Sequence, residues 1–180
     1  PVLLEEMVDF SRELAQLVAR SPSGETTAWP AVETTQANGV CAEVILPAPT
    51  DGGRMVEIAA ELGRQIAQDL DVIGVLAVEL FETADGRLLV NELAMRPHNS
   101  GHVTIEGSVT SQFEQHLRAI CDMPLGSTDS RHPWAVMVNV FGAMDLERYS
   151  RLTQSGDVKL HNYGKEPRAG RKVGHVTATG

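Results

Sequence analysis

Residues 79–92 of this chain read ELFETADGRLLVNE, and this stretch decides how its central part folds. Asp85 and Gly86 are the residue types that form a two-residue turn between two antiparallel strands. The register set by such a turn places Glu79 directly opposite Glu92. Because like charges that face each other destabilise a sheet, the sequence predicts that something positive lies between these two carboxylates.

A divalent cation is the simplest partner for the Glu79–Glu92 pair. Mg²⁺ binds carboxylate oxygens in this way when it also bridges nucleotide phosphates. The alternative is that the two glutamates are separately solvated on a polar face of the hairpin. The residues that follow Glu92 favour the metal.

The composition is that of an ordinary soluble globular protein. The chain has 180 residues, 42% of them hydrophobic and 22% charged, and its net charge of -9 argues against nonspecific binding to nucleic acid. No apolar run approaches the roughly 20 residues that cross a bilayer and no signal peptide is visible, so no membrane partner is expected. Cys41 and Cys121 lack CxxC spacing, so we expect reduced packing residues in a cytoplasmic protein.

Strands and helices are interleaved along the chain, which indicates an α+β fold. Apolar residues recur at helical spacing from Arg54 to Leu70, with Asp51 as the expected cap. A second amphipathic helix is expected from Ser108 to Cys121, and its buried stripe would comprise Val109, Phe113, Leu117 and Ile120. Strands are expected near residues 2–8, 26–32, 40–46, 72–81, 87–93, 134–141, 158–163 and 173–177. A Ser-, Asp- and Pro-rich stretch near residues 126–133 divides the chain into a main lobe, residues 1–126, and a small β-rich domain, residues 127–180.

The segment NELAMRPHNSGH, residues 91–102, carries the densest chemistry of the chain. A metal-compatible carboxylate is followed within a few residues by a guanidinium, an imidazole, an amide and a hydroxyl. Pro97 and Gly101 indicate that the backbone leaves the strand and curls as a loop. A zinc site at His98 and His102 is the competing interpretation, but the HExxH helix that would support it is missing.

Together with IEG at residues 105–107 and TSQFEQH at 110–116, this segment resembles the signature of one ATP-grasp family, the 5-(carboxyamino)imidazole ribonucleotide synthases. The resemblance runs along the whole chain. Residues 5–14, EEMVDFSREL, are similar to the adenine hinge of that family, and residues 20–24, RSPSG, to the turn after it. The motifs HNYGK at 161–165, GRK at 170–172 and GH at 174–175 are similar to its carboxy-terminal substrate-binding segment.

The resemblance implies the carboxy-terminal part of an ATP-grasp domain, with a mixed or antiparallel sheet and helices, followed by a small β-rich domain. It also implies that ATP phosphorylates bicarbonate and that the resulting CO₂ carboxylates the amine of 5-aminoimidazole ribonucleotide. The expected metal is Mg²⁺, or Mn²⁺ in its place, held by Glu79 and Glu92. Dimers are common in the family, so the resemblance allows a homodimer.

The resemblance assigns roles to further residues. Arg96 and His98 are the expected catalytic residues. The nucleotide would be bound along the adenine by Glu5, Glu6, Met7 and Val8, at the ribose by Glu13, and elsewhere by Gln36, Asn91 and Glu92. The ribonucleotide substrate would be bound by Arg96, His98, Asn99, Ser100, Lys165, Arg168, Arg171 and Lys172. For the four cationic residues at the end of that set, the alternative is a solvated basic tail.

Two departures from the family pattern leave alternatives open. Ala94 stands where many ATP-grasp enzymes have Asn, which favours this branch, and Met95 replaces a common proline. The chain also begins without Met and lacks the expected amino-terminal Rossmann-like domain and phosphate-binding lysines, so we expect part of a longer protein. By itself it could be an inactive binding or structural fragment. Formate-dependent glycinamide ribonucleotide transformylase shares the fold and the Arg96-Pro97-His98 start, but residues 98–102, HNSGH, favour the carboxylating enzyme.

Overall fold

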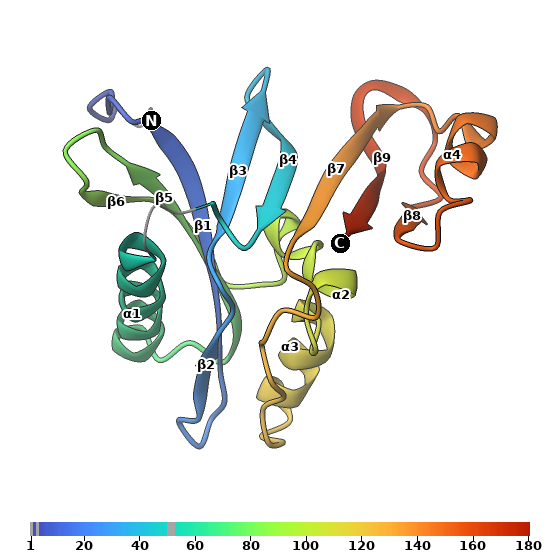
Figure 1. Cartoon of the computed structure of the whole chain (residues 1–180). Coiled ribbons are helices and arrows are strands. Elements are labelled where there is room, and N and C mark those ends of the chain that lie inside the picture. Colours follow the sequence, from blue (N-terminus) through green and yellow to red (C-terminus); the bar gives the residue numbers. More distant parts are fainter. Residues whose placement is uncertain (1, 3, 50–52) are drawn as a thin grey trace.

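In the computed structural model, which describes residues 2, 4–49 and 53–180, one antiparallel sheet runs through the whole molecule (Figure 1). Its described strands are β1 (Arg12–Arg20), β2 (Thr26–Ala28), β3 (Val32–Ala37), β4 (Val40–Leu46), β5 (Gly74–Glu82), β6 (Leu88–Ala94), β7 (Ala135–Gly142), β8 (Val158–Asn162) and β9 (Arg168–Thr179). They lie in the order β6-β5-β1-β3-β4-β7-β9-β8, with β2 beside β1. The expected α+β fold with an antiparallel sheet is confirmed.

Helices cover both faces of the sheet at β1 and β5 (Figure 1). They are α1 (Arg54–Asp69), α2 (Thr104–Gly107), α3 (Gln112–Ile120) and α4 (Leu146–Leu152), with a 3-10 turn, η1 (Asn99–Gly101), before α2. No helix in the described part of the chain is long and apolar enough to span a bilayer. The helix expected over residues 54–70 is confirmed as α1, whereas the cap expected at Asp51 lies outside the described residues.

Strand β1 is buried on both faces, which is why its sequence shows no clear alternation. Leu14 and Val18 pack with α1 in one apolar cluster, while Leu17 packs with Trp29 in a second cluster on the other face. The close approach of α1 requires a glycine, because a Cβ at Gly63 would lie 2.8 Å from side-chain carbons of β1. The strand expected at residues 2–8 is wrong, since the described residues of that segment form neither helix nor strand.

The β5–β6 hairpin has a wider turn than the sequence predicts. Thr83 and Arg87 close the turn through a 3.0 Å bond from the Thr83 N–H to the Arg87 carbonyl, so three residues form its tip. A β-bulge then shifts the register: Leu80 pairs with Val90, but Glu79 pairs with Glu92. The extra residue in the turn and the bulge compensate each other, so the predicted two-residue turn is wrong while the predicted Glu79–Glu92 pairing is confirmed.

Helix α3 presents a different face to the core from the one expected. The predicted stripe is exposed, with Leu117 at 60% and Val109, Phe113 and Ile120 each above 40%. The buried residues are instead Gln112, Gln115 and Ala119. This face packs against loop backbone, whose N–H and C=O groups need hydrogen-bond partners that only polar side chains supply. The Gln115 amide accordingly donates to the Gly126 carbonyl at 2.7 Å and accepts from the Gly126 N–H at 2.8 Å.

The two expected domains share the sheet, because β4 pairs directly with β7 over residues 43–46 and 135–138. The described residues between α3 and β7 form neither helix nor strand. One of them, Ser130, makes an isolated β-bridge with Ser108, which precedes α3. A division at residues 126 and 127 stays a prediction.

Replacing Gln115 with alanine is expected to lower the free energy of unfolding by about 1 to 3 kcal/mol, because both hydrogen bonds to Gly126 are lost from a fully buried amide. Urea unfolding followed by circular dichroism measures the change. Gln68→Ala, on the exposed side of α1, is the control and should stay within about 0.5 kcal/mol of the parent. Equal stabilities for both variants would contradict the assigned role of Gln115.

Candidate active site

A polar cavity of about 500 Å³ lies on the sheet face opposite α1. Residues from five neighbouring strands, β6, β5, β1, β3 and β4, converge on it together with residues from the loop after β6 and from β9. Its lining comprises Glu13, Gln36, Gly39, Val40, Cys41, Glu79, Asn91, Glu92, His98, Asn99 and Lys172. Eight of these eleven residues are predicted site residues; sequence analysis missed Gly39 and Val40, which have no polar side chain, and expected Cys41 to be a packing residue.

Three carboxylates meet at one end of this cavity. Glu79 pairs with Glu92 on β6 and with Ala15 on β1, which places it on the same face as Glu13. The bulge brings Asn91 to the same side, where its Nδ2 lies 3.5 Å from Glu79 Oε2. Burial raises the pKa of Glu79, and the charges of Glu92 and Glu13 raise it further. A cation would relieve this repulsion, so the donor set fits the expected metal.

His98 is held firmly at its backbone and at its ring. The Gln112 amide accepts from the His98 N–H and donates to its carbonyl, both at 2.8 Å. The ring Nδ1 lies 2.9 Å from Ser100 Oγ, and Nε2 lies 3.5 Å from Glu79 Oε1. Burial, followed by the charge of Arg96, lowers the pKa of His98, so the imidazole is neutral at pH 7. A neutral ring beside the carboxylates can accept a proton.

Ser100 and Arg96 do not line the cavity, although both are predicted substrate residues. Ser100 is 1% exposed, and its hydroxyl contacts the His98 ring. Arg96 is exposed, and its Nη1 donates to the Pro97 carbonyl at 3.2 Å.

Two amide side chains link the loop after β6 to strand β7. Asn99 on η1 and Asn139 on β7 exchange hydrogen bonds of 3.1 and 2.7 Å, and Asn139 Nδ2 also donates to the Cys41 carbonyl at 2.9 Å. Lys172 Nζ donates to Asn99 Oδ1 at 3.2 Å, and burial lowers the pKa of this lysine. Asn139 was missed by sequence analysis, although an amide inside the apolar run 135–141 is a signal because buried amides require partners.

The cavity lining does not include the other three cationic residues predicted to bind the substrate, which are Lys165, Arg168 and Arg171. Lys165 Nζ lies 5.1 Å from the centre of the Tyr163 ring, and Arg171 Nη1 donates to the Glu166 carbonyl at 3.4 Å. Arg168 is exposed at the start of β9. Of the four predicted cationic residues, only Lys172 lines the cavity that contains the three carboxylates.

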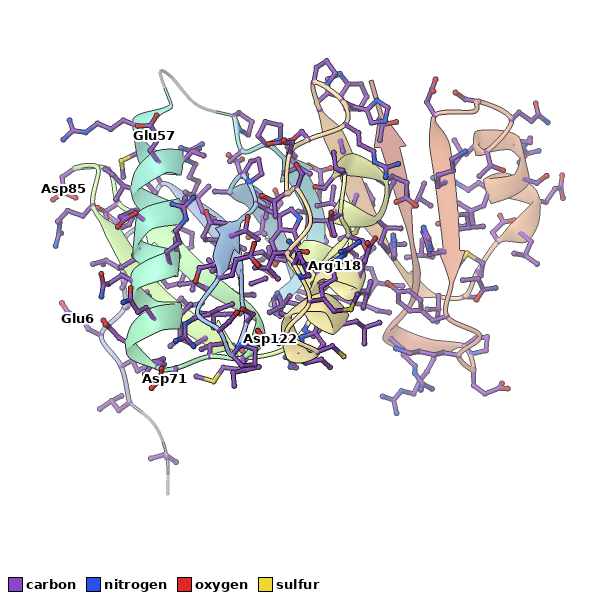
Figure 2. All side chains as sticks on the ribbon, turned by 90° about the horizontal axis from the view of Figure 1, so that it is seen from below. Glu6, Glu57, Asp71, Asp85, Arg118 and Asp122 are labelled. Atoms are coloured by element: carbon purple, nitrogen blue, oxygen red, sulfur yellow. The ribbon has the colours of Figure 1, made fainter. Side chains whose placement is uncertain are left out.

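The predicted adenine segment lies at a second cavity, of about 480 Å³, beside the tip of the β5–β6 hairpin. Glu6, Met7 and Val8 line it together with residues 83–85, 87 and 89. Figure 2 shows Glu6 and Asp85 at the same edge of the molecule, away from Arg118 and Asp122 of the α3 region. Glu5 is exposed and lines neither cavity, so the predicted nucleotide residues fall into two groups.

The zinc site considered for His98 and His102 does not form. His98 Nδ1 contacts Ser100, whereas His102 Nδ1 lies 2.9 Å from Gln112 Nε2. Within the described ranges, neither histidine belongs to a group of three side chains that could hold a metal.

Comparison with protein families gives two matches. Residues 1–113 match the ATP-grasp domain, and residues 135–180 match the phosphoribosylaminoimidazole carboxylase C-terminal domain. N5-carboxyaminoimidazole ribonucleotide synthase of Mycobacterium bovis is 54% identical over 99% of this chain and 43% of its own length.

Solved structures agree with these matches. The synthetase of Thermus thermophilus has a TM-score of 0.90 at 41% identity, covering 97% of this chain and 47% of the other. The synthase of Aspergillus clavatus, in complex with ADP and 5-aminoimidazole ribonucleotide, has a TM-score of 0.88 at 35% identity over 97% of this chain and 48% of its own. The chain thus spans less than half the length of these relatives. It belongs to the ATP-grasp family, in the branch of the N5-carboxyaminoimidazole ribonucleotide synthases.

Proposed function

We propose that this chain carries the metal and substrate sites of an enzyme that carboxylates 5-aminoimidazole ribonucleotide with ATP and bicarbonate. A bicarbonate oxygen attacks the γ-phosphorus of ATP, ADP leaves, and carboxyphosphate forms. Carboxyphosphate breaks into CO₂ and phosphate. The exocyclic amine of the ribonucleotide attacks the CO₂ and loses a proton, which gives the carbamate.

The observation that carries this proposal is the arrangement of charges in the main cavity. Glu13, Glu79 and Glu92 line the same cavity as Lys172 and Asn99, which are hydrogen-bonded to each other, and His98 Nε2 lies 3.5 Å from Glu79 Oε1. Phosphoryl transfer depends on positioning and charge neutralisation more than on covalent catalysis. A cavity that offers cation ligands and anion donors together suits a metal-bound phosphate beside an anionic substrate.

Glu79 and Glu92 would hold Mg²⁺ or Mn²⁺, which when bound neutralises charge on the phosphoryl group in transfer. Glu13, Gln36 and Asn91 line the same cavity and would contact the nucleotide. Glu5, Glu6, Met7 and Val8 would lie along the adenine, by family resemblance. A cytoplasmic location and a homodimer rest on the same resemblance.

The loop after β6 would bind the ribonucleotide. His98, whose neutral form is favoured by burial, would help to move the amine proton, and Ser100 would fix the ring through Nδ1. Asn99 and Lys172 would donate hydrogen bonds to the substrate. The resemblance assigns the substrate phosphate to four exposed or partly exposed cations, Arg96, Lys165, Arg168 and Arg171.

The first test is ADP release that depends on bicarbonate and is stimulated by 5-aminoimidazole ribonucleotide. It compares this chain with a joined protein, in which the chain follows the part of the M. bovis relative that it does not cover. Activity in the joined protein and not in the chain alone would assign the chain the catalytic metal and substrate sites. Absence of stimulated activity in both would contradict the proposal, and stimulation by formate and glycinamide ribonucleotide would favour the transformylase.

Glu92→Gln is expected to reduce the turnover of the joined protein by about 100-fold or more, because one metal carboxylate is lost where phosphoryl charge develops. Raising the Mg²⁺ concentration should recover part of the loss. Glu43→Gln, on β4 outside the cavity lining, is the matched control and should retain the parent rate. An unchanged rate in Glu92→Gln would remove the carboxylate pair from the mechanism.

Cys41 provides a binding test that needs no turnover. Burial raises the pKa of its thiol to about 11, so at pH 8 about one thiol in a thousand is ionised. In the Cys121→Ser chain, alkylation of Cys41 should be slow at pH 8 and accelerate about tenfold per pH unit up to pH 10. Mg²⁺ with ADP should slow it further by covering the cavity. Labelling that is fast at pH 8 and indifferent to nucleotide would contradict this placement of Cys41.

The Asn139→Ala variant tests whether Asn139 on β7 positions the loop after β6, which would bind the ribonucleotide. Because Asn139 anchors Asn99 and the Cys41 carbonyl, its loss should raise the KM for the ribonucleotide by about tenfold in the joined protein, with a smaller effect on the KM for ATP. Gln154→Ala, at an exposed position after α4, is the control and should leave both KM values unchanged. Equal changes in both KM values would indicate a general structural role.

A further inference from the structure

A stack of histidine rings joins α2 to the carboxy-terminal strands, outside the main cavity. The ring of His175 on β9 lies 5.2 Å from the ring of His102 and 4.4 Å from the ring of His161 on β8. His161 Nε2 lies 2.7 Å from Glu106 Oε1 on α2. None of these residues lines the cavity of the proposed chemistry.

Two buried ligand atoms in this stack lack a hydrogen-bond partner within the described residues. His175 is 1% exposed, and its Nε2 is unpartnered. The same holds for Glu106 Oε2. Leaving a buried polar atom unpaired is costly, and each such atom calls for an explanation. Here the two orphaned atoms belong to residues that also come together: one ligand atom from each of Glu106, His161 and His175 lies within 4.8 Å of the others.

The surroundings of His175 suit a neutral imidazole with a free lone pair. Tyr163 Oη lies 2.6 Å from His175 Nδ1. When Nδ1–H donates to Tyr163, the lone pair is on Nε2, the unpartnered atom. Histidines that bind metals are typically oriented in this way by a hydrogen bond at the other ring nitrogen.

We propose that Glu106, His161 and His175 form a binding site for Zn²⁺. Two imidazole nitrogens and one carboxylate are a common three-residue zinc set, which leaves a fourth position for water. Mg²⁺ prefers an all-oxygen shell, so this site and the Glu79–Glu92 pair would select different ions. The ion would take the place of the hydrogen between His161 Nε2 and Glu106 Oε1, and the neutral His161 ring would then carry its hydrogen on Nδ1.

Binding requires a modest contraction of the cluster. Ligand atoms about 2.0–2.1 Å from a tetrahedral zinc lie roughly 3.3 Å apart, whereas those of this cluster lie within 4.8 Å. The stacked, nearly parallel rings of His161 and His175 must also rotate to aim both nitrogens at one ion. His161 can make this movement, because its side chain is 34% exposed; the same opening provides a route for the ion.

The consequence of zinc binding would be mechanical. Glu106 lies on α2, before the irregular stretch between α3 and β7. His161 and His175 lie on β8 and β9, after that stretch. One ion would therefore fix α2 against β8 and β9. Because a ligand that binds the folded state alone stabilises it by mass action, zinc should raise the unfolding temperature.

The test measures Zn²⁺ binding to the chelator-treated 180-residue chain by competition with a chromogenic chelator, in excess Mg²⁺ to occupy the carboxylate pair. We expect one Zn²⁺ per chain and a rise in Tm of roughly 5 °C when zinc exceeds Kd by about 100-fold. Co²⁺ in place of Zn²⁺ should give the visible absorption of a four-coordinate nitrogen and oxygen site. Absence of binding would overturn the proposal and leave a proton-bridged histidine cluster.

His161→Gln and Glu106→Gln should each weaken zinc binding by more than about tenfold and abolish the rise in Tm. His161 is partly exposed, so its variant should fold, which circular dichroism checks independently. His132→Ala, at an exposed position away from the stack, and Glu92→Gln, at the carboxylate pair, should bind zinc as the parent does. If folded His161→Gln and Glu106→Gln retain the parent affinity, the ion binds elsewhere and the proposed site is wrong.

Discussion

The ladder between β1 and β5 is the constraint on which the rest of the structure depends. It joins nine consecutive residue pairs, and the apolar residues along it, apart from the partly buried Phe81, are fully buried on both faces. The sheet face that carries Leu17 and Ala77 is apolar over most of the ladder. Near the start of β1 and the end of β5, the same face carries Glu13 and Glu79 instead. Because the strands beneath them cannot slip without exposing the core, the two carboxylates are fixed by the burial of their neighbours.

Amide side chains supply the second constraint, since they hold segments that have no regular structure. Gln16 bridges the Leu17 and Trp29 carbonyls, Gln112 grips the backbone of His98, and Gln115 grips Gly126. All three amides are fully buried, and those of Gln112 and Gln115 use a donor and an acceptor together, as a neighbouring strand would. Because Gln112 holds its backbone, the loop that carries His98 can be as rigid as a strand, and the imidazole is then held in one position.

These amides also explain where sequence analysis succeeds and fails. The hairpin and its Glu79–Glu92 pair can be predicted because turn and strand patterns are local. The predicted turn is wrong: the Thr83 hydroxyl accepts from the Arg87 N–H at 3.1 Å and favours a wider tip, which the bulge at Asn91 then corrects. Periodicity predicts an apolar buried face for helix α3, but its glutamines meet backbone that comes from elsewhere in the chain. Asn139 reaches the site through tertiary contacts, and no local pattern reports these.

The electrostatics of the main cavity indicate why its ligands should bind together. Burial and neighbouring carboxylates raise the pKa of Glu79, while burial lowers the pKa of Lys172, so each charged form is disfavoured in the free protein. A cation at the carboxylates relieves the first penalty, and an anion at the lysine relieves the second. A cation alone leaves the lysine poorly compensated, and an anion alone adds to the repulsion at Glu13, Glu79 and Glu92. A cation and an anion bound together would relieve both penalties, so the electrostatics of the cavity favour joint occupancy over either ion alone.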